Sequence, residues 1–289
     1  MSTRNNEIFA HGDPSGAAAI REAHASGRVR DTMLDDFGIE IPAETVPLPS
    51  QGITYPVGHP FHGQSTVDIT AMTAREEDIL TSQALIKKGT VITELIRSCL
   101  VNKAARPEHL LSGDRNAIMV AIRITGYGRE YEAGITCEAC GQNSDSSFDL
   151  ASLPIKNLTI EPIAPGQNCF EFKLPRTGAV VNFKFLTGAD EEQILSEHER
   201  KKKKLKVKTD SLVTAKLEKA ILSVNGIEDR GKIANFVRRM PAADSRALRN
   251  YMDEHEPGVE MQAWTTCEHC GEDQLASMPI GAKFFWPDA

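Results

Sequence analysis

Two short cysteine motifs constrain the fold of this chain more than any other feature. The segment "TCEACG" contains Cys137 and Cys140, and "TCEHCG" contains Cys267 and Cys270. The separation of Cys137 from Cys267 equals that of Cys140 from Cys270, so the two motifs are in register. Two cysteines separated by two residues supply half of a tetrahedral metal site. We therefore expect the two motifs, called here the first and second cysteine knuckle, to meet in the folded chain.

Four cysteines in this pattern predict one structural zinc ion. Catalytic zinc usually keeps three protein ligands and an open position, whereas structural zinc is closed by four, so Cys137, Cys140, Cys267 and Cys270 favour a structural Zn²⁺. Two alternatives stay open. The thiols could be buried or joined in disulfides, or one pair could be redox-active, although a redox pair normally opens a helix and has no matched second knuckle.

The similarity extends upstream of both knuckles without a gap. Asp114 precedes Cys137 by the same distance in sequence by which Asp244 precedes Cys267. After each aspartate, apolar residues follow the spacing of one helical face, and the positions expected to be buried are Ile118, Ile122, Leu248 and Met252. Further upstream, "VDITAMTAREEDIL" resembles "VNFKFLTGADEEQIL", and "LPSQG" resembles "LPRTG". The sequence therefore predicts one structural unit that occurs twice.

These patterns predict an α+β fold built from two tandem related repeats and clasped by one zinc site. Residues 46–159 form the first repeat and residues 160–289 the second, each with strands and helices that end in a knuckle. Residues 1–45 have no counterpart and read as an N-terminal extension. Helices are expected at 73–88, 90–100, from Asp114 onward, and over a long segment at 189–223.

Composition excludes some classes of protein. Hydrophobic residues make up 40% of the 289 residues, and no run of 18 apolar residues exists, so a membrane protein is not expected. The N-terminus lacks the apolar stretch of a secretory signal, which predicts a protein that stays in a cytosol. The formal net charge of −7 and the pI near 5.7 make nucleic acid an unlikely partner.

Two features could carry a further binding site. The basic run "ERKKKKLKVK", residues 199–208, could bind nucleic acid or an acidic partner, but no aromatic residues interleave for base stacking, so a solvated helical face is favoured. His59 and His62 lie in the Pro- and Gly-rich insertion "ITYPVGHPFHGQ" and are expected to be polar loop residues. Cys99 falls on an apolar helical stripe and is expected in the core, and Cys169 lies in the short strand-like stretch "NCFEFKL".

No catalytic constellation is present, and no small-molecule substrate is expected. The segment "GIEDRGKI" has the glycine and lysine spacing of a phosphate-binding loop but lacks the following Ser or Thr, and the preceding "ILSVN" reads as the end of a helix. It is interpreted as a turn between helices. An enzyme is therefore not expected, since one that used the thiolate-bound metal would need an open coordination position.

Several of these segments resemble a known family. "LPSQGITYP", "MTAREEDIL", "LLSGDRNAIMVAIRITGYGREYE", both knuckles, "LTGADEE", "MPAADSRALR" and the ending "MPIGAKFFWP" are together similar to the T4-type bacteriophage baseplate protein family. The resemblance covers most of residues 46–288. It implies a non-enzymatic structural or assembly component of a contractile phage tail baseplate, in the hub region, located in the virion or in the host cytoplasm during assembly. Its partners would be other phage tail or baseplate proteins.

The competing interpretation is a zinc-ribbon protein that binds nucleic acid through the lysines near 201–208. The sequence identifies no partner-binding residues. It does favour contacts outside the repeats, with the arm of residues 1–45 ahead of the insertion at 53–64. The terminal aromatic cluster of Phe284, Phe285 and Trp286 is expected to plug the chain's own core.

Overall fold

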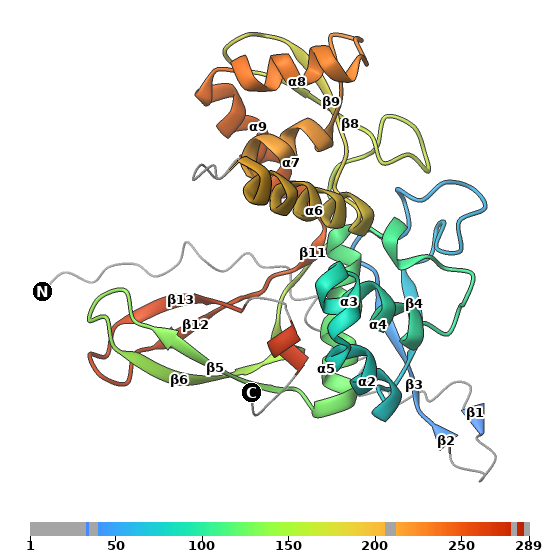
Figure 1. Ribbon diagram of the computed structural model, residues 1–289, viewed down its shortest axis with the longest axis vertical. Coiled ribbons are helices and arrows are strands. Elements are labelled where there is room, and N and C mark those ends of the chain that lie inside the picture. The colour runs from blue at the N-terminus through green and yellow to red at the C-terminus, as the bar shows by residue number, and fades with distance from the viewer. Residues whose placement is uncertain (1–32, 35–39, 206–211, 279–281, 286–289) are drawn as a thin grey trace, which may run out of the picture.

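The computed structural model describes residues 33–34, 40–205, 212–278 and 282–285. Most of the N-terminal extension, the end of the lysine run and Trp286 lie outside this part of the chain. Figure 1 shows three lobes: a body that carries α2 to α5, a second helical lobe with α7 to α9, and a pair of long hairpins that project to one side. A short two-stranded pairing of β1 (Met33–Leu34) with β2 (Glu40–Ile41) precedes the body.

The body is formed by a strand pair and four helices. Strand β3 (Ala43–Pro47) pairs antiparallel with β4 (Thr66–Thr70), and the segment between them contains "LPSQG" and the insertion. Helices α2 (Ala74–Thr81), α3 (Gln83–Lys88), α4 (Val91–Cys99) and α5 (Ser112–Tyr127) follow, with a 3₁₀ turn at Pro107–His109. The helix expected at 73–88 is thus two helices, because Ser82 adopts an extended conformation between them.

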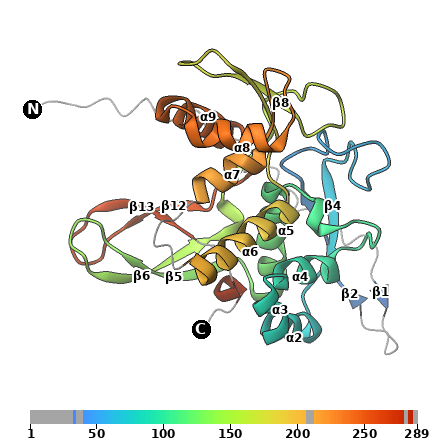
Figure 2. The ribbon, with the colours of Figure 1, turned by 45° about the horizontal axis from the view of Figure 1, so that its top comes forward.

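The second helical lobe begins with another strand pair. Strand β8 (Phe170–Lys173) pairs with β9 (Val180–Phe183), and β10 (Ile221–Val224) adds to the other edge of β9. The helices of this half are α6 (Gly188–Leu205), α7 (Leu212–Ala220), α8 (Arg230–Arg239) and α9 (Ala242–His255), of which α7, α8 and α9 contact the sheet. In the view of Figure 2, α6 lies between the two helical lobes.

The long helix expected at 189–223 is wrong at its C-terminal end. Its described part is helical in α6 and α7, and residues 206–211 between them lie outside the described residues. Residues 221–224 form strand β10, which pairs antiparallel with β9. The apolar, β-branched "ILSV" therefore completes a sheet and does not end a helix, because its partner strand supplies hydrogen bonds that a local pattern cannot reveal.

Two long antiparallel hairpins form the third lobe. Strands β5 (Glu130–Thr136) and β6 (Asn143–Asp149) form hairpin 1, and β12 (Gln262–Thr266) and β13 (Asp273–Ser277) form hairpin 2. The bases of the two hairpins are joined where β7 (Ile155–Lys156) pairs with β11 (Gly258–Val259). The contact with α5 is close: a Cβ atom added to Gly113 would lie 1.6 Å from the Pro257 carbonyl oxygen.

One hydrophobic core runs through both halves of the chain. Ile118 and Ile122 of α5 and Leu248 of α9 are fully buried in the same cluster, and Met252 is half-buried at its edge. The prediction of burial thus holds for three of these four positions. None of the described helices combines the length and the apolar character that crossing a lipid bilayer requires.

Candidate metal centre

Each knuckle is the turn that closes one hairpin, and the two turns share the same backbone geometry. In hairpin 1 the Cys137 amide donates to the Gln142 carbonyl at 2.8 Å, and the Gly141 amide donates to the Cys137 carbonyl at 2.9 Å. In hairpin 2 the corresponding distances, Cys267 to Glu272 and Gly271 to Cys267, are 2.9 and 2.8 Å. Gly141 and Gly271 have φ of +71° and +73°, a conformation that glycine adopts without steric cost.

The two knuckles bring all four predicted ligands together. The Cys137 and Cys270 sulfurs are 3.6 Å apart, the Cys140 and Cys267 sulfurs 3.8 Å, and all four lie within 4.8 Å of one another. These thiols are free, and a disulfide would need about 2.05 Å. A regular tetrahedron with Zn–S bonds of about 2.3 Å has S···S edges of about 3.8 Å. The spacing of the sulfurs therefore fits a tetrahedral ion.

Backbone amides at the knuckles favour the thiolate form. The pKa of Cys137 is lowered to about 7, first because the Cys140 amide hydrogen-bonds its sulfur and then through the Ala139 amide and neighbouring thiols, against burial. At Cys270 the Glu272 amide also lowers the pKa, but burial and the three other sulfurs outweigh it and raise the value to about 12. Four crowded thiols cannot all ionise without a cation, whereas a divalent ion would let them do so.

The hairpins also contact each other along their length. The Ser146 and Thr265 hydroxyls are 2.9 Å apart, and the Glu138 amide donates to the Gln274 side chain at 3.0 Å. Along each strand the residues that face the other hairpin are buried or half-buried, while the alternate ones are exposed except for the half-buried Asp149. The hairpins therefore face each other (Figure 1), and the four sulfurs lie together at their tip.

Asp114 and Asp244, in the first turns of α5 and α9, make matching contacts. Asp114 accepts hydrogen bonds from the Ser50 amide at 2.9 Å and the Ser50 hydroxyl at 2.6 Å, and Ser50 is the third residue of "LPSQG". Asp244 accepts from the amide of Arg176, the third residue of "LPRTG", at 2.7 Å, and from that of Thr177 at 3.0 Å. Each helix is thus held to the turn of its own strand pair by an aspartate in its first turn.

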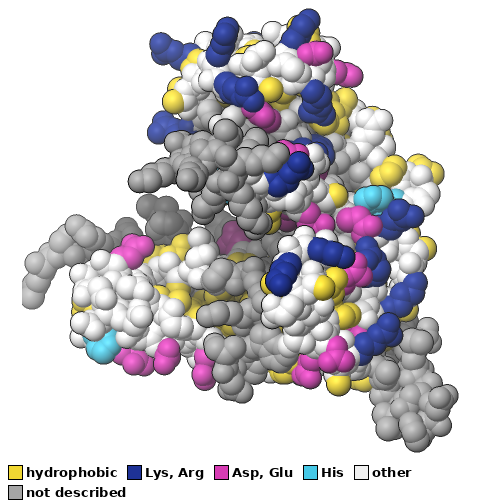
Figure 3. Space-filling view, in the orientation of Figure 1, with side chains coloured by type: hydrophobic (Ala, Val, Ile, Leu, Met, Phe, Trp, Pro, Cys, Tyr) yellow, Lys and Arg dark blue, Asp and Glu magenta, His cyan; other side chains and the backbone are white. Residues whose placement is uncertain are grey.

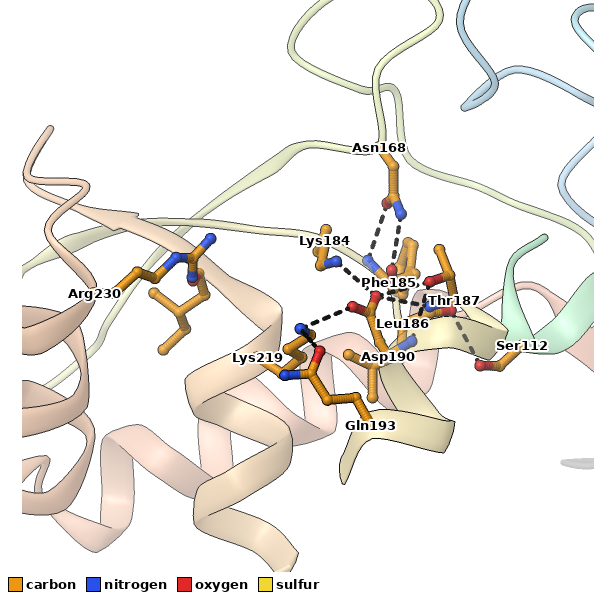
Figure 4. Close-up of polar contacts among 11 residues, drawn as sticks. Ser112, Asn168, Lys184, Phe185, Leu186, Thr187, Asp190, Gln193, Lys219 and Arg230 are labelled. Carbon is orange, nitrogen blue, oxygen red and sulfur yellow. Dashed lines mark hydrogen bonds and ion pairs between the residues drawn. The ribbon is translucent and has the colours of Figure 1, made fainter. Parts of the chain in front are cut away.

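A second matched contact stands at the start of α2 and α6. The Thr73 amide donates to the Glu76 carboxylate at 2.9 Å, and the Thr187 amide donates to the Asp190 carboxylate at 3.1 Å. In both cases the threonine hydroxyl donates to the same carboxylate oxygen. Figure 4 shows Asp190 in this position, where Lys184 also reaches it at 2.6 Å. In both helices, the acidic side chain three residues after the threonine thus accepts a hydrogen bond from the threonine amide at the start of the helix.

The other residues singled out in the sequence are placed as follows. His59 stacks on Tyr55 with ring centroids 4.6 Å apart, and His62 Nδ1 lies 2.6 Å from the Tyr55 carbonyl oxygen, so both serve the loop. Within the described residues, the four knuckle cysteines form the one group with metal-binding geometry. Cys99 is buried in the core, as predicted. Cys169 is half-buried directly before β8.

Sequence patterns missed several buried contacts. In the insertion, Tyr55 and Phe61 are only 3% exposed, and the Tyr55 hydroxyl donates to Asp114 at 2.5 Å. Phe284 and Phe285 are fully buried, as expected of a plug. The sequence did not indicate the hydrogen bond that holds this segment, in which the buried Arg123 donates to the Phe284 carbonyl at 3.1 Å. The contacts of the two aspartates had one signal in the sequence. "LPSQG" precedes Asp114 by a distance similar to that by which "LPRTG" precedes Asp244.

Comparison with known proteins supplies the family. The model of the family described as T4 bacteriophage base plate protein matches residues 53–286, which is most of the chain. No curated protein and no solved structure gives a match. The matched segment spans the body except for β3, the second helical lobe and both hairpins, and so includes all four clustered cysteines. The chain therefore belongs to the T4 bacteriophage base plate protein family.

Proposed function

We propose that this chain is a non-enzymatic structural or assembly component of the hub region of a contractile tail baseplate, held rigid by one zinc ion. The observation that carries the proposal is the tip where two hairpins, one from each half of the sequence, place four free thiols at tetrahedral spacing. Membership of the base plate family supplies the setting. A closed four-cysteine site leaves no open position for chemistry, which fits a structural role.

We further propose that residues 46–159 and 160–289 are two copies of one unit. Four shared features support this. Each half has a strand pair joined through an LPxxG turn, a threonine and acidic pair at the start of the next helix, and a first-turn aspartate bound to the turn. Each then ends in a hairpin closed by a knuckle of the same geometry. A pseudo-two-fold axis near the metal would relate the copies.

The zinc site would fix the relative orientation of the two copies. The hairpins project away from the helical lobes (Figure 1) and contact each other through polar side chains such as Ser146 and Thr265. Their strands also carry apolar side chains, since Ala276 is buried in the hydrophobic core and Ile135 packs against it. These contacts lie along the strands, whereas the four cysteines lie in the turns that close the hairpins. Four metal–sulfur bonds at the tip would lock the pair, which is what a component that presents several docking surfaces in fixed geometry needs.

The docking role can be tested through the arm of residues 1–45, most of which lies outside the described residues. We expect a chain that lacks residues 1–40 to fold and to retain the metal but to fail to join baseplate intermediates. Assembly is followed by co-purification with the tail proteins of the same phage. A truncated chain that still co-assembles normally would place the interface on the repeats. Mass spectrometry of mature particles then distinguishes a virion component from an assembly factor.

A further inference from the structure

Hairpin 2 carries an exposed apolar pair on its outer face. Trp264 of β12 is 73% exposed and Leu275 of β13 is 48% exposed, and the two residues are directly opposite each other across the strands. Single exposed apolar residues are common, but a tryptophan and a leucine side by side form a patch, and tryptophan is the residue most enriched at binding hot spots.

Hairpin 1 provides an internal control for this patch. When the two knuckles are aligned, Trp264 and Leu275 correspond to Gly134 and Asp145 of hairpin 1, which are also a directly opposed cross-strand pair. They occupy the same place in the same kind of hairpin without any apolar side chain. The Trp–Leu pair is therefore not required to build a hairpin of this kind, and its exposure calls for a partner surface.

The charge around the patch restricts what can bind there. The two hairpins, residues 130–149 and 260–277, contain no lysine or arginine. They carry nine acidic residues: Glu130, Glu132, Glu138, Asp145, Asp149, Glu260, Glu268, Glu272 and Asp273. A lobe of this charge repels nucleic acid and anionic lipid, and it attracts a surface with cationic side chains. Arginine suits the patch best, because its guanidinium can stack on the indole while it pairs with a carboxylate.

The same chain presents such a surface at its other end. Residues 230–249, which cover α8 and most of α9, contain six lysines and arginines and a single acidic residue, the buried Asp244. Lys232, Arg238, Arg239 and Arg246 are exposed. Figure 3 shows basic side chains gathered over the α8 lobe and acidic ones along the hairpins. The two surfaces lie on separate lobes in Figures 1 and 2, so contact between them requires two copies of the chain.

We propose that the Trp264–Leu275 patch docks onto the basic α8–α9 surface of a second copy of this chain. The contact joins two different surfaces, so it is head-to-tail, and it generates a ring if the rotation closes and a filament if it does not. This inference goes beyond the proposed zinc-clasped scaffold. Its expected signature is association that weakens with salt, because charged side chains surround the apolar pair.

The first test is sedimentation velocity of the purified full-length chain over a concentration series up to about 100 µM, a range that populates contacts of micromolar Kd. The chain is expected to self-associate at low salt. Replacing the pair with its hairpin 1 counterparts, Trp264→Gly with Leu275→Asp, should weaken association by about tenfold or more. Val57→Ser, which removes an 85% exposed apolar side chain elsewhere, should leave association unchanged.

Charge reversal provides the second test and is independent of the apolar pair. Chains with Glu260→Lys and Glu272→Lys, or with Arg238→Glu and Arg239→Glu, should each fail to self-associate, and a mixture of the two should associate again. Zinc content and thermal unfolding of every variant separate this outcome from damage to the scaffold. A wild-type chain that stays monomeric, association unaffected by the Trp264 and Leu275 changes, or no recovery in the mixture would overturn the proposal.

Discussion

The two hairpins differ much less at their tips than on their outer faces. Both knuckles have the same pair of backbone hydrogen bonds, at 2.8 and 2.9 Å in each, and their glycines have nearly equal φ angles of +71° and +73°. On the outer face, by contrast, Gly134 and Asp145 stand where Trp264 and Leu275 stand. The turn geometry that brings the four thiols together is constrained, whereas an exposed cross-strand position is free to change. The comparison therefore separates residues that hold the scaffold from residues available for contacts.

The hydrogen bonds of Asp114 and Asp244 likewise combine a shared contact with one that is found in only one half of the chain. Asp114 receives three hydrogen bonds, two from Ser50 and one from Tyr55 of the insertion, while Asp244 receives two, both from backbone amides. The contact with the LPxxG turn is common to both halves. Tyr55 of the insertion supplies the third donor to Asp114, so the insertion is tied to the core through this aspartate.

The largest expected effect is loss of the metal site from either half. Cys137→Ser and Cys267→Ser should each remove the bound zinc and lower the free energy of unfolding by at least about 4 kcal/mol, the stabilisation that a ligand at a thousand times its Kd supplies. The two losses should be similar because each variant leaves three sulfurs. Urea unfolding with parallel zinc analysis measures both. A large effect from only one knuckle would contradict a site shared by the two halves.

A smaller and unequal effect is expected at the aspartates. Asp114→Ala leaves three buried donors without their acceptor and should lower the free energy of unfolding by about 3 kcal/mol. Asp244→Ala removes two hydrogen bonds and should cost less. Chemical denaturation of the two variants compares them directly. Equal losses would mean that the Tyr55 hydroxyl adds nothing to the contact that the halves have in common.

Next come the threonines at the starts of α2 and α6. Thr73→Ala and Thr187→Ala each remove a hydroxyl that donates to the acidic side chain three residues later, and each should lower the free energy of unfolding by about 1 kcal/mol. Thermal unfolding measures the effect, with Thr81→Ala at the exposed end of α2 as the control. If Thr73→Ala behaves like this control while Thr187→Ala does not, the two helix starts are not equivalent.

The smallest effect is a difference in pH dependence between the aspartates. Burial raises the pKa of Asp114, against its hydrogen bonds. At Asp244, burial is outweighed by the amides of Arg176 and Thr177, and the pKa is lowered. Stability contributed by Asp114 is thus fully present below its ordinary value of 3.8 and is lost as pH rises through the raised pKa. Stability contributed by Asp244 is present above 3.8 and is lost as pH falls through the lowered pKa.

The stability deficit of Asp114→Asn should therefore shrink as pH rises above 3.8, and that of Asp244→Asn should shrink as pH falls below it. Denaturation of both variants and the wild type in one buffer series measures these deficits. The pH dependence of the metal site is common to all three chains and cancels in the differences. Deficits that change in the same direction would show that the two aspartates lie in equivalent electrostatic environments.

Local signals predicted the site well and tertiary contacts poorly. The knuckles could be predicted from the sequence because the two cysteines and the glycine of each lie within one turn. Strand β10 could not be predicted in this way, because "ILSV" forms a strand only by pairing with β9, which is distant in sequence. The break between α2 and α3 was also missed, because Ser82 is not a strong helix breaker. The contact of the buried Tyr55 was missed because its partner, Asp114, is distant in sequence. The exposure of Trp264 required knowledge of which hairpin face looks outward.

X-ray absorption at the zinc edge of the purified full-length chain can show whether one zinc ion joins the two halves through both knuckles. We expect one zinc per chain with a single shell of four sulfurs at about 2.3 Å. Each knuckle supplies two of these sulfurs, so both halves are needed to complete the shell. A shell that mixes sulfur with nitrogen or oxygen, two zinc ions per chain, or a metal-free chain with four reactive thiols would contradict it.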